Sequence, residues 1–163
     1  MDNIFKGIIP PVITAFNKNG DFDEHAQREI IRFLLPHVHG FYPTGTYGCG
    51  PLMTTEERKR AAEVIVDEVS GKLPVIIHIG SINTAQVVEL AKHAEAIGAD
   101  GVGAIPPYYY NYSQEDLLEY FRSILHATNL PVFAYNNPGL SNNPISPETV
   151  AQIASEGLYG LKD

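Results

Sequence analysis

The sequence predicts an α/β fold built on a parallel sheet. Two observations predict it: short apolar, β-branched segments alternate with longer amphipathic segments, and six such apolar segments follow one another along the chain. Strict alternation of strands and helices favours parallel strands joined by right-handed crossovers. The chain has 163 residues, 44% of them hydrophobic, and no linker-like stretch, so we expect a single domain spanning residues 1–163.

The first half of the chain contains two expected strands, each followed by an expected helix. The strands are "GIIPPVITAF" and "HVHGFYPTG", and the helices have apolar residues at helical spacing. In the second helix the Thr54 hydroxyl can cap the backbone amides while Glu57 bonds back, which is a capping box. In order, these elements are expected at 7–16, 23–35, 37–45 and 54–69.

The second half contains four further expected strands and the three helices between them. The strands are "LPVIIHIG", "ADGVGAIPP", "LPVFAYNNP" and "LYGLKD". Ser146 can cap the last helix, and Pro147 suits its first position. In order, these elements are expected at 73–80, 83–97, 99–107, 113–127, 130–138, 146–154 and 158–163.

Two architectures fit this order of elements. A doubly wound sheet of five or six strands would be complete at this length. A TIM (β/α)8 barrel typically needs ~250 residues, so the chain would hold only about the first six strands and would be truncated after the sixth. Neither G-x-G-x-x-G nor G-x-x-x-x-G-K-[ST] occurs, which argues against a nucleotide site. Chain length favours the wound sheet, whereas the placement of polar residues favours the barrel.

Composition limits the partners of the protein. Eleven basic and nineteen acidic residues give a net charge of −8, which argues against nucleic acid and against an anionic membrane surface. The single cysteine, Cys49, excludes an internal disulfide and a cysteine-based metal cluster, so a cytoplasmic location is the simplest expectation. His37 and His39 form an H-x-H pair without a third ligand nearby in sequence, so no metal site is expected.

Polar side chains stand where the expected strands end. In parallel α/β folds these ends face one rim, where active sites form. A lysine desolvated there can attack a carbonyl as a neutral amine, tyrosine hydroxyls can move protons, and amides of a glycine-rich turn can hold a carboxylate. This set predicts Schiff-base chemistry on a 2-oxo acid. Its members are Thr46, Tyr47, His78, Tyr108, Tyr109, Tyr110, Tyr135, Asn136 and Lys162.

Six stretches of the chain, in order, resemble a known family. They are "GIIPPVITAF", "GTYG", "TTEER", "PPYYY", "YNNP" and the terminal "GLKD". Together they resemble the pyruvate-dependent class I aldolases, a family that includes dihydrodipicolinate synthase, N-acetylneuraminate lyase and 2-keto-3-deoxygluconate aldolase. The resemblance implies the barrel fold, no cofactor, pyruvate and an aldehyde or sugar acid as small-molecule partners, and a homotetramer built as a dimer of dimers.

The resemblance also implies roles for individual residues. Lys162 would be the Schiff-base lysine and Tyr135 the general acid/base. Thr46 would link Tyr135 to Tyr109, which this family often supplies across a dimer interface. The backbone of Thr46, Tyr47 and Gly48 would hold the pyruvate carboxylate.

Three departures from the family pattern bear on the substrate. Tyr47 replaces the second hydroxyl residue of the loop and Cys49 replaces its acid. Leu140 stands where dihydrodipicolinate synthases place an arginine that grips a second carboxylate. A 2-keto-3-deoxy sugar acid or an N-acetylneuraminate-like substrate is therefore favoured. The alternative enzyme is 4-hydroxy-tetrahydrodipicolinate synthase, which joins pyruvate to aspartate semialdehyde.

Two hypotheses other than an aldolase stay open. The chain can be a non-catalytic barrel fragment or interaction module, since six barrel strands would leave open sheet edges. It can also be a complete doubly wound protein with an unrelated ligand. His78, alone on an apolar strand, is expected to be an interior histidine.

Overall fold

The computed structural model describes residues 4–163, which fall into two compact units. The first unit runs to His78 and adds Ala96–Asp100, and the second comprises Ile79–Glu95 and Gly101–Asp163. Each unit buries apolar side chains of its own, such as Ile31 in the first and Phe121 in the second. The single domain expected from the sequence stays a prediction.

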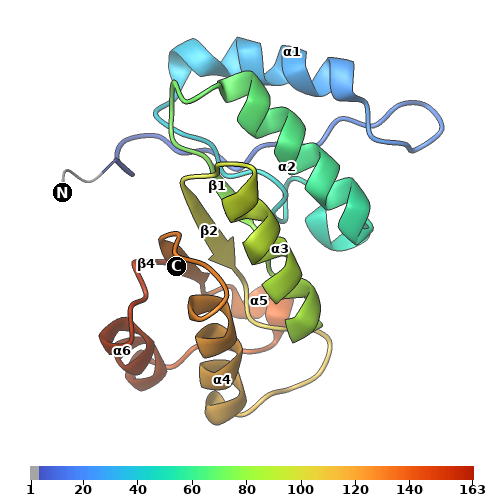
Figure 1. Cartoon of the computed structure of the whole chain (residues 1–163). Coiled ribbons are helices and arrows are strands. Elements are labelled where there is room, and N and C mark those ends of the chain that lie inside the picture. Colours follow the sequence, from blue (N-terminus) through green and yellow to red (C-terminus); the bar gives the residue numbers. More distant parts are fainter. Residues whose placement is uncertain (1–3) are drawn as a thin grey trace. The chain divides into compact units, whose positions relative to one another are not determined.

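Helices and short strands alternate along the described chain (Figure 1). The α-helices are α1 (Glu24–Leu34), α2 (Thr55–Val69), α3 (Thr84–Ala96), α4 (Gln114–Leu125), α5 (Pro138–Ser141) and α6 (Pro147–Ser155). The strands are β1 (Ile76–His78), β2 (Gly101–Ala104), β3 (Val132–Tyr135) and β4 (Gly160–Lys162). Two 3-10 turns, η1 (Leu35–His37) and η2 (Gly50–Leu52), complete the set.

The described residues form four strands rather than the six expected, because the first two expected strands do not form continuous ladders. Segments 7–16 and 37–45 run parallel where they pair, at an isolated bridge between Pro11 and Tyr42. The Val12 amide donates to the Tyr42 carbonyl and the Tyr42 amide to the Pro10 carbonyl. Proline has no amide hydrogen, so Pro10, whose backbone faces segment 37–45, cannot supply the donor that would precede the Val12 amide in the ladder.

In the first unit, α1 and α2 are joined by ion pairs. Arg28 contacts Asp67 with 2.7 Å between Nη1 and Oδ2, and Arg32 contacts Glu68 with 2.7 Å between Nε and Oε1. The hydrogen bond from Arg32, aided by Arg28, holds the pKa of Glu68 below its ordinary value, against an opposing effect of burial. The predicted capping box is present at α2, where the Glu57 amide donates to Thr54 Oγ1 and the Thr54 amide to Glu57.

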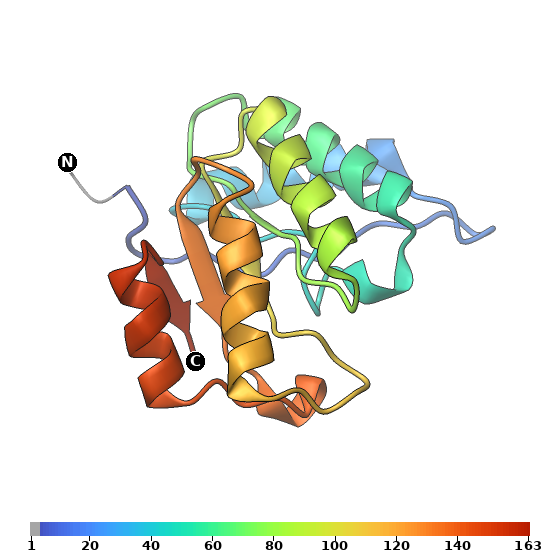
Figure 2. The same ribbon diagram turned by 60° about the horizontal axis from the view of Figure 1, so that its bottom comes forward.

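The second unit contains a parallel sheet in which β2 pairs with β3 and β3 with β4. Helices α4 and α6 contact each other, and α4 also contacts β3 (Figure 2). The apolar stripe of α4 buries Leu117 and Phe121, while β3 buries Val132 and Ala134. The parallel α/β fold expected from the sequence is therefore confirmed.

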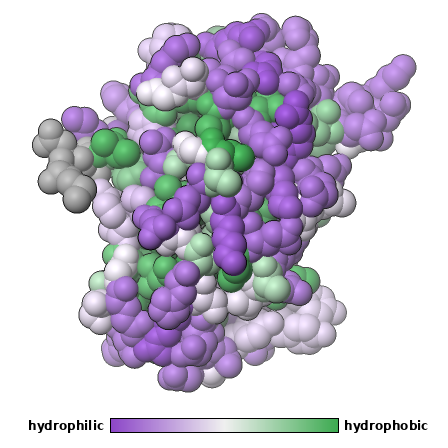
Figure 3. Space-filling model, in the orientation of Figure 1, coloured by the Kyte–Doolittle hydropathy of each residue, from purple (hydrophilic) through white to green (hydrophobic). Residues whose placement is uncertain are grey.

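The molecular surface in Figure 3 is mainly hydrophilic, with hydrophobic side chains gathered in smaller patches. Within residues 4–163, no helix combines the length and the apolar character that crossing a membrane requires.

Candidate active site

The last residues of β3 and β4 lie side by side. The parallel register pairs Tyr135 with Lys162. The Lys162 Nζ lies 3.3 Å from the centroid of the Tyr135 ring, a distance at which an ammonium is attracted to the aromatic face. Both side chains stand at the carboxyl ends of their strands, where parallel folds build their active sites. The structure thus brings together the predicted nucleophile and the predicted acid/base.

Asn136 fixes the end of β4. Its amide donates to the Lys162 carbonyl across 2.8 Å, and its Nδ2 donates to Asp163 Oδ1 across 2.7 Å. Its Oδ1 accepts from the Ile145 amide at 3.0 Å, which anchors the asparagine to the segment before α6. These bonds hold the chain where it leaves Lys162, at the Lys162 carbonyl and the Asp163 side chain.

Lys162 is exposed in the structure, which differs from the desolvated lysine expected from the sequence. The physical reason is the position of β4, which pairs only with β3 among the described residues. The Tyr135 ring therefore covers one side of the amine, and the other side is open.

Asn137 is a site residue that the sequence analysis missed. Its Nδ2 donates to the Tyr135 hydroxyl across 2.8 Å, and the residue is half-buried. The signal was the second asparagine of "YNNP", but nothing in a sequence tells whether such an amide turns toward the preceding tyrosine. Because the hydroxyl oxygen accepts this bond, its own proton is directed elsewhere.

Tyr109 lies in the loop between β2 and α4. Its side chain is 79% exposed, and its ring meets that of Tyr110 edge-on, with 4.9 Å between centroids. Its φ of 85° is unusual for a bulky residue and costs about 1–3 kcal/mol. A tyrosine held outward in a strained backbone is a candidate for contact with a ligand or another subunit.

The glycine-rich turn that follows Pro43 belongs to the first unit. Thr46 and Tyr47 are exposed, whereas Gly48 is buried. A Cβ atom on Gly48 would lie 2.8 Å from the Val12 carbonyl oxygen, so only glycine fits there without displacement. Among the described residues, the amides of these three residues donate no hydrogen bond, which leaves them available to an anion.

Thr44 anchors the start of the same turn. Its hydroxyl contacts the His78 carbonyl oxygen at 2.9 Å, and its φ is 57°. His78 is 1% exposed and its ring lies 5.9 Å from that of Tyr42, which agrees with the interior histidine expected from the sequence.

The predicted site residues are divided between the two units. The second unit holds Lys162, Tyr135, Tyr109 and Leu140, and the first holds Thr46, Tyr47 and Gly48. Leu140 lies in α5 and is 56% exposed. The predicted link from Thr46 to Tyr135 stays a prediction. Within residues 4–163, no group of three or more histidine, cysteine or acidic residues is placed to hold a metal ion.

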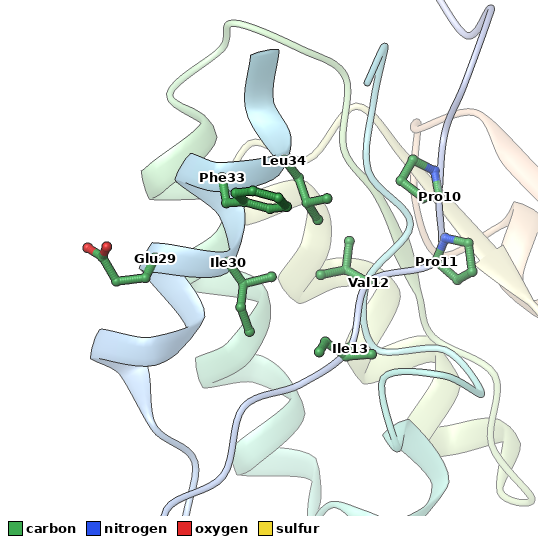
Figure 4. Close-up of a pocket in the computed structure, with 8 residues that line it drawn as sticks. All are labelled: Pro10, Pro11, Val12, Ile13, Glu29, Ile30, Phe33 and Leu34. Carbon is green, nitrogen blue, oxygen red and sulfur yellow. The ribbon is translucent and has the colours of Figure 1, made fainter. Parts of the chain in front are cut away.

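An apolar cavity of about 630 Å³ lies elsewhere, in the first unit. Figure 4 shows α1 side chains facing Val12 and Ile13 across it, while Glu29 points away. None of the predicted site residues lines it, so it is separate from the lysine–tyrosine pair. Its lining residues are Pro10, Pro11, Val12, Ile13, Glu29, Ile30, Phe33 and Leu34.

The fold and the site define a parallel α/β protein with a lysine and a tyrosine at neighbouring strand ends. A family model described as "Dihydrodipicolinate synthetase family" matches residues 4–163. The chain belongs to this family, which confirms the resemblance found in the sequence.

Three similar proteins illustrate the relationship. "Probable 2-dehydro-3-deoxy-D-pentonate aldolase YjhH" of Escherichia coli is 42% identical over 98% of this chain and 54% of that protein. A "4-hydroxy-tetrahydrodipicolinate synthase" of Brucella suis is 36% identical over 98% of this chain and 56% of that protein. A similar crystal structure is that of YagE from E. coli K12 in complex with pyruvate, a prophage protein belonging to the dihydrodipicolinic acid synthase family. Its TM-score is 0.95 at 35% identity, and the match covers 99% of this chain and 55% of that chain. The chain spans about half the length of the curated relatives it matches.

Proposed function

We propose that the protein is a Schiff-base-forming lyase or aldolase that cleaves or forms a carbon–carbon bond between pyruvate and an aldehyde. The observation that carries this proposal is the pairing of Lys162 with Tyr135 at adjacent strand ends, with 3.3 Å between Nζ and the ring centroid. An amine beside a phenol supplies both the nucleophile and the proton carrier that imine chemistry needs. The family membership supports the same reaction class.

In the proposed cleavage, the Lys162 amine attacks the C2 carbonyl of a 2-oxo acid and water leaves, which forms an imine. Tyr135 takes the proton from the C4 hydroxyl, the C3–C4 bond breaks, and an aldehyde departs. The bonding electrons remain as an enamine of pyruvate. Protonation at C3 and hydrolysis of the imine then release pyruvate and the free amine. Aldol addition is the same sequence in reverse.

The other predicted residues have supporting roles in this proposal. The amides of Thr46, Tyr47 and Gly48 hold the pyruvate carboxylate, supported by their lack of other acceptors among the described residues. Thr46 and Tyr109 relay the proton of Tyr135. Exposure of the Tyr109 side chain supports its contribution to a neighbouring subunit, in a dimer of dimers.

The proposed architecture is a TIM (β/α)8 barrel of which this chain supplies the N-terminal part. The parallel order of β2, β3 and β4 and the similarity to family structures support it. We also propose a cytoplasmic enzyme that uses no cofactor and has neither nucleic acid nor membrane as a partner, supported by the single cysteine and the net charge of −8.

The proposed substrate is a 2-keto-3-deoxy sugar acid or an N-acetylneuraminate-like compound. Leu140 provides no cation for a second carboxylate, and the similar E. coli protein named as a pentonate aldolase supports a sugar acid. The name of the Brucella relative favours a second candidate, 4-hydroxy-tetrahydrodipicolinate synthase. Under that alternative, aspartate semialdehyde would be the better acceptor.

Borohydride reduction in the presence of pyruvate tests the proposal, because it converts the imine into a stable secondary amine. We expect a pyruvate-derived adduct that peptide mapping places on Lys162. Lys162→Ala should abolish the adduct, and the control Lys92→Ala should leave it unchanged. Failure to trap an adduct in the folded, intact protein would refute the Schiff-base function and favour a non-catalytic role.

A further inference from the structure

Asn143, in the segment between α5 and α6, is buried with 2% of its surface exposed. Its side chain connects two loops that are distant in sequence. Nδ2 donates to the carbonyl oxygens of Pro107 and Tyr110, both across 2.8 Å, and to that of Ser141 across 2.9 Å. Oδ1 accepts from the Tyr112 amide at 2.8 Å. The two hydrogens of Nδ2 serve three acceptors, so one hydrogen is shared between two carbonyls and the buried amide has no hydrogen left over.

These bonds enclose Tyr109. The Pro107 carbonyl lies before it in the chain, and the Tyr110 carbonyl and the Tyr112 amide lie after it. A positive φ at a tyrosine persists only where the surroundings fix the backbone. Asn143 provides that constraint, because it binds the loop on both sides of the strained residue.

The asparagine is itself connected to the other tyrosine of the site. The Asn143 amide donates to Ser141 Oγ at 3.2 Å, and Ser141 Oγ donates to the Asn137 carbonyl at 3.1 Å. The Asn137 side chain donates to the Tyr135 hydroxyl. A continuous set of hydrogen bonds within the second unit therefore runs from Tyr135 to the loop that carries Tyr109.

We propose that Asn143 is a positioning residue that holds Tyr109 in its strained, outward conformation. This inference rests on the proposed function for its catalytic consequence. Holding the loop in this way requires a side-chain amide. Aspartate at position 143 keeps the acceptor for the Tyr112 amide but has no hydrogen to donate to the Pro107 or Tyr110 carbonyl. Asn142, the next residue toward the N-terminus, is exposed and offers a matched control.

Deuterium exchange into the methyl group of pyruvate measures the effect with one substrate. The imine loses a C3 proton to a base and regains a deuteron from solvent, so exchange follows proton transfer without an aldehyde. We expect Asn143→Asp to lower kcat for exchange about 30- to 100-fold, with KM for pyruvate within about twofold, because misplacement of a catalytic group affects kcat. Asn142→Asp should match the unmodified protein.

A double-mutant cycle with Tyr109→Phe separates positioning from general damage. If Asn143 acts through Tyr109, Asn143→Asp combined with Tyr109→Phe should exchange no more slowly than Tyr109→Phe alone. Fully additive losses would overturn the proposal. Should Asn143→Asp not fold, Asn143→Gln retains the amide and displaces it by one methylene, and the same cycle applies.

Amide hydrogen exchange at Tyr112 tests the constraint independently of catalysis. The Tyr112 amide should exchange at least about tenfold faster in Asn143→Asp or Asn143→Gln than in Asn142→Asp. Glutamine moves the acceptor, and aspartate keeps the acceptor but loses the bonds to Pro107 and Tyr110 that hold the loop against it. Unchanged protection would refute the role of Asn143 even in an active enzyme. Lost protection in a protein that forms no pyruvate imine would support the constraint and refute the proposed function instead.

Discussion

Asn137 donates its side-chain amide to the hydroxyl of Tyr135 across 2.8 Å, from the residue that precedes α5. The bond occupies one lone pair of the phenol and leaves the hydroxyl hydrogen directed away from Asn137. Lys162 lies over the face of the same ring. The ring is thus contacted on its face by an amine and at its hydroxyl by an amide, which together fix its orientation.

Replacing Asn137 with leucine should lower kcat about two- to tenfold with little change in KM for pyruvate. The hydroxyl would lose a partner worth about 0.5–1.5 kcal/mol, and leucine nearly preserves the size of the side chain. Steady-state kinetics checks this, with Asn19→Leu in an exposed turn as control. An Asn137→Leu enzyme with unchanged kcat would show that the orienting bond has no catalytic role.

Replacing Tyr135 with phenylalanine should keep the ring beneath Lys162 and remove the proton carrier. We expect turnover to fall about 10²- to 10⁴-fold, the usual contribution of a general acid/base. The thermal midpoint should change little, because the ring remains. Turnover assays and thermal unfolding check both effects, with Tyr159→Phe as the matched control: Tyr159 packs on Phe133 with 5.2 Å between centroids. Equal activities of the two variants would contradict the assigned role of Tyr135.

Replacing Leu140 with arginine should shift substrate preference toward an aldehyde that carries a carboxylate. Leu140 is 56% exposed, so the long cationic side chain can enter without disturbing the core. We expect the ratio of kcat/KM for aspartate semialdehyde to that for a keto-deoxy sugar acid to rise at least about tenfold. Leu140→Met, which adds no charge, is the control. A ratio that responds equally to both substitutions would exclude a charge effect at this position.

Acid should remove the stabilisation that Glu68 provides between α1 and α2. The Arg32 hydrogen bond lowers the pKa of folded Glu68 below its ordinary value of 4.5, so the folded carboxylate binds protons less readily than the unfolded one. Its stabilisation is therefore present above about pH 4.5 and is lost as the pH falls through the lowered pKa.

Glu68→Gln should accordingly reduce the free energy of unfolding by about 0.5–1 kcal/mol at pH 7, and the difference should shrink toward pH 3. Urea unfolding at several pH values measures it. Glu56→Gln provides a control, since the Glu56 side chain is 81% exposed and its ion pair with Lys59 lies within α2. A difference that stays constant from pH 7 to pH 3 would argue against an ionic origin.

The order of helices and strands could be read from the sequence because each element carries a local signal. The helix expected at 54–69 is observed at Thr55–Val69, since its capping box and apolar stripe are both local. The first two strands could not be read correctly, because an apolar run does not show how far prolines will interrupt its ladder. Helix α5 has only four residues, too few to show a helical period.

The lysine–tyrosine pair could be anticipated because parallel strands bring their carboxyl ends together, whatever their separation in sequence. The asparagines of the site could not. Asn143 contacts residues 31 to 36 positions away, and a sequence gives no sign that a buried amide will satisfy those particular carbonyls. Hydrogen bonds of this kind depend on the final packing of loops.

Pro11 has a further consequence for the behaviour of segment 7–16. The Pro10 carbonyl and the Val12 amide both bind Tyr42, so the backbone of Pro11 between them faces the opposite side. On that side Pro11 offers a carbonyl but no hydrogen, and a foreign strand that approached this edge would meet a gap in the row of donors. Evolution commonly uses proline in this way to keep strand edges from templating aggregation. Pro11, next to the proline that shortens the native ladder, therefore disfavours pairing with a foreign strand on its own side of the segment.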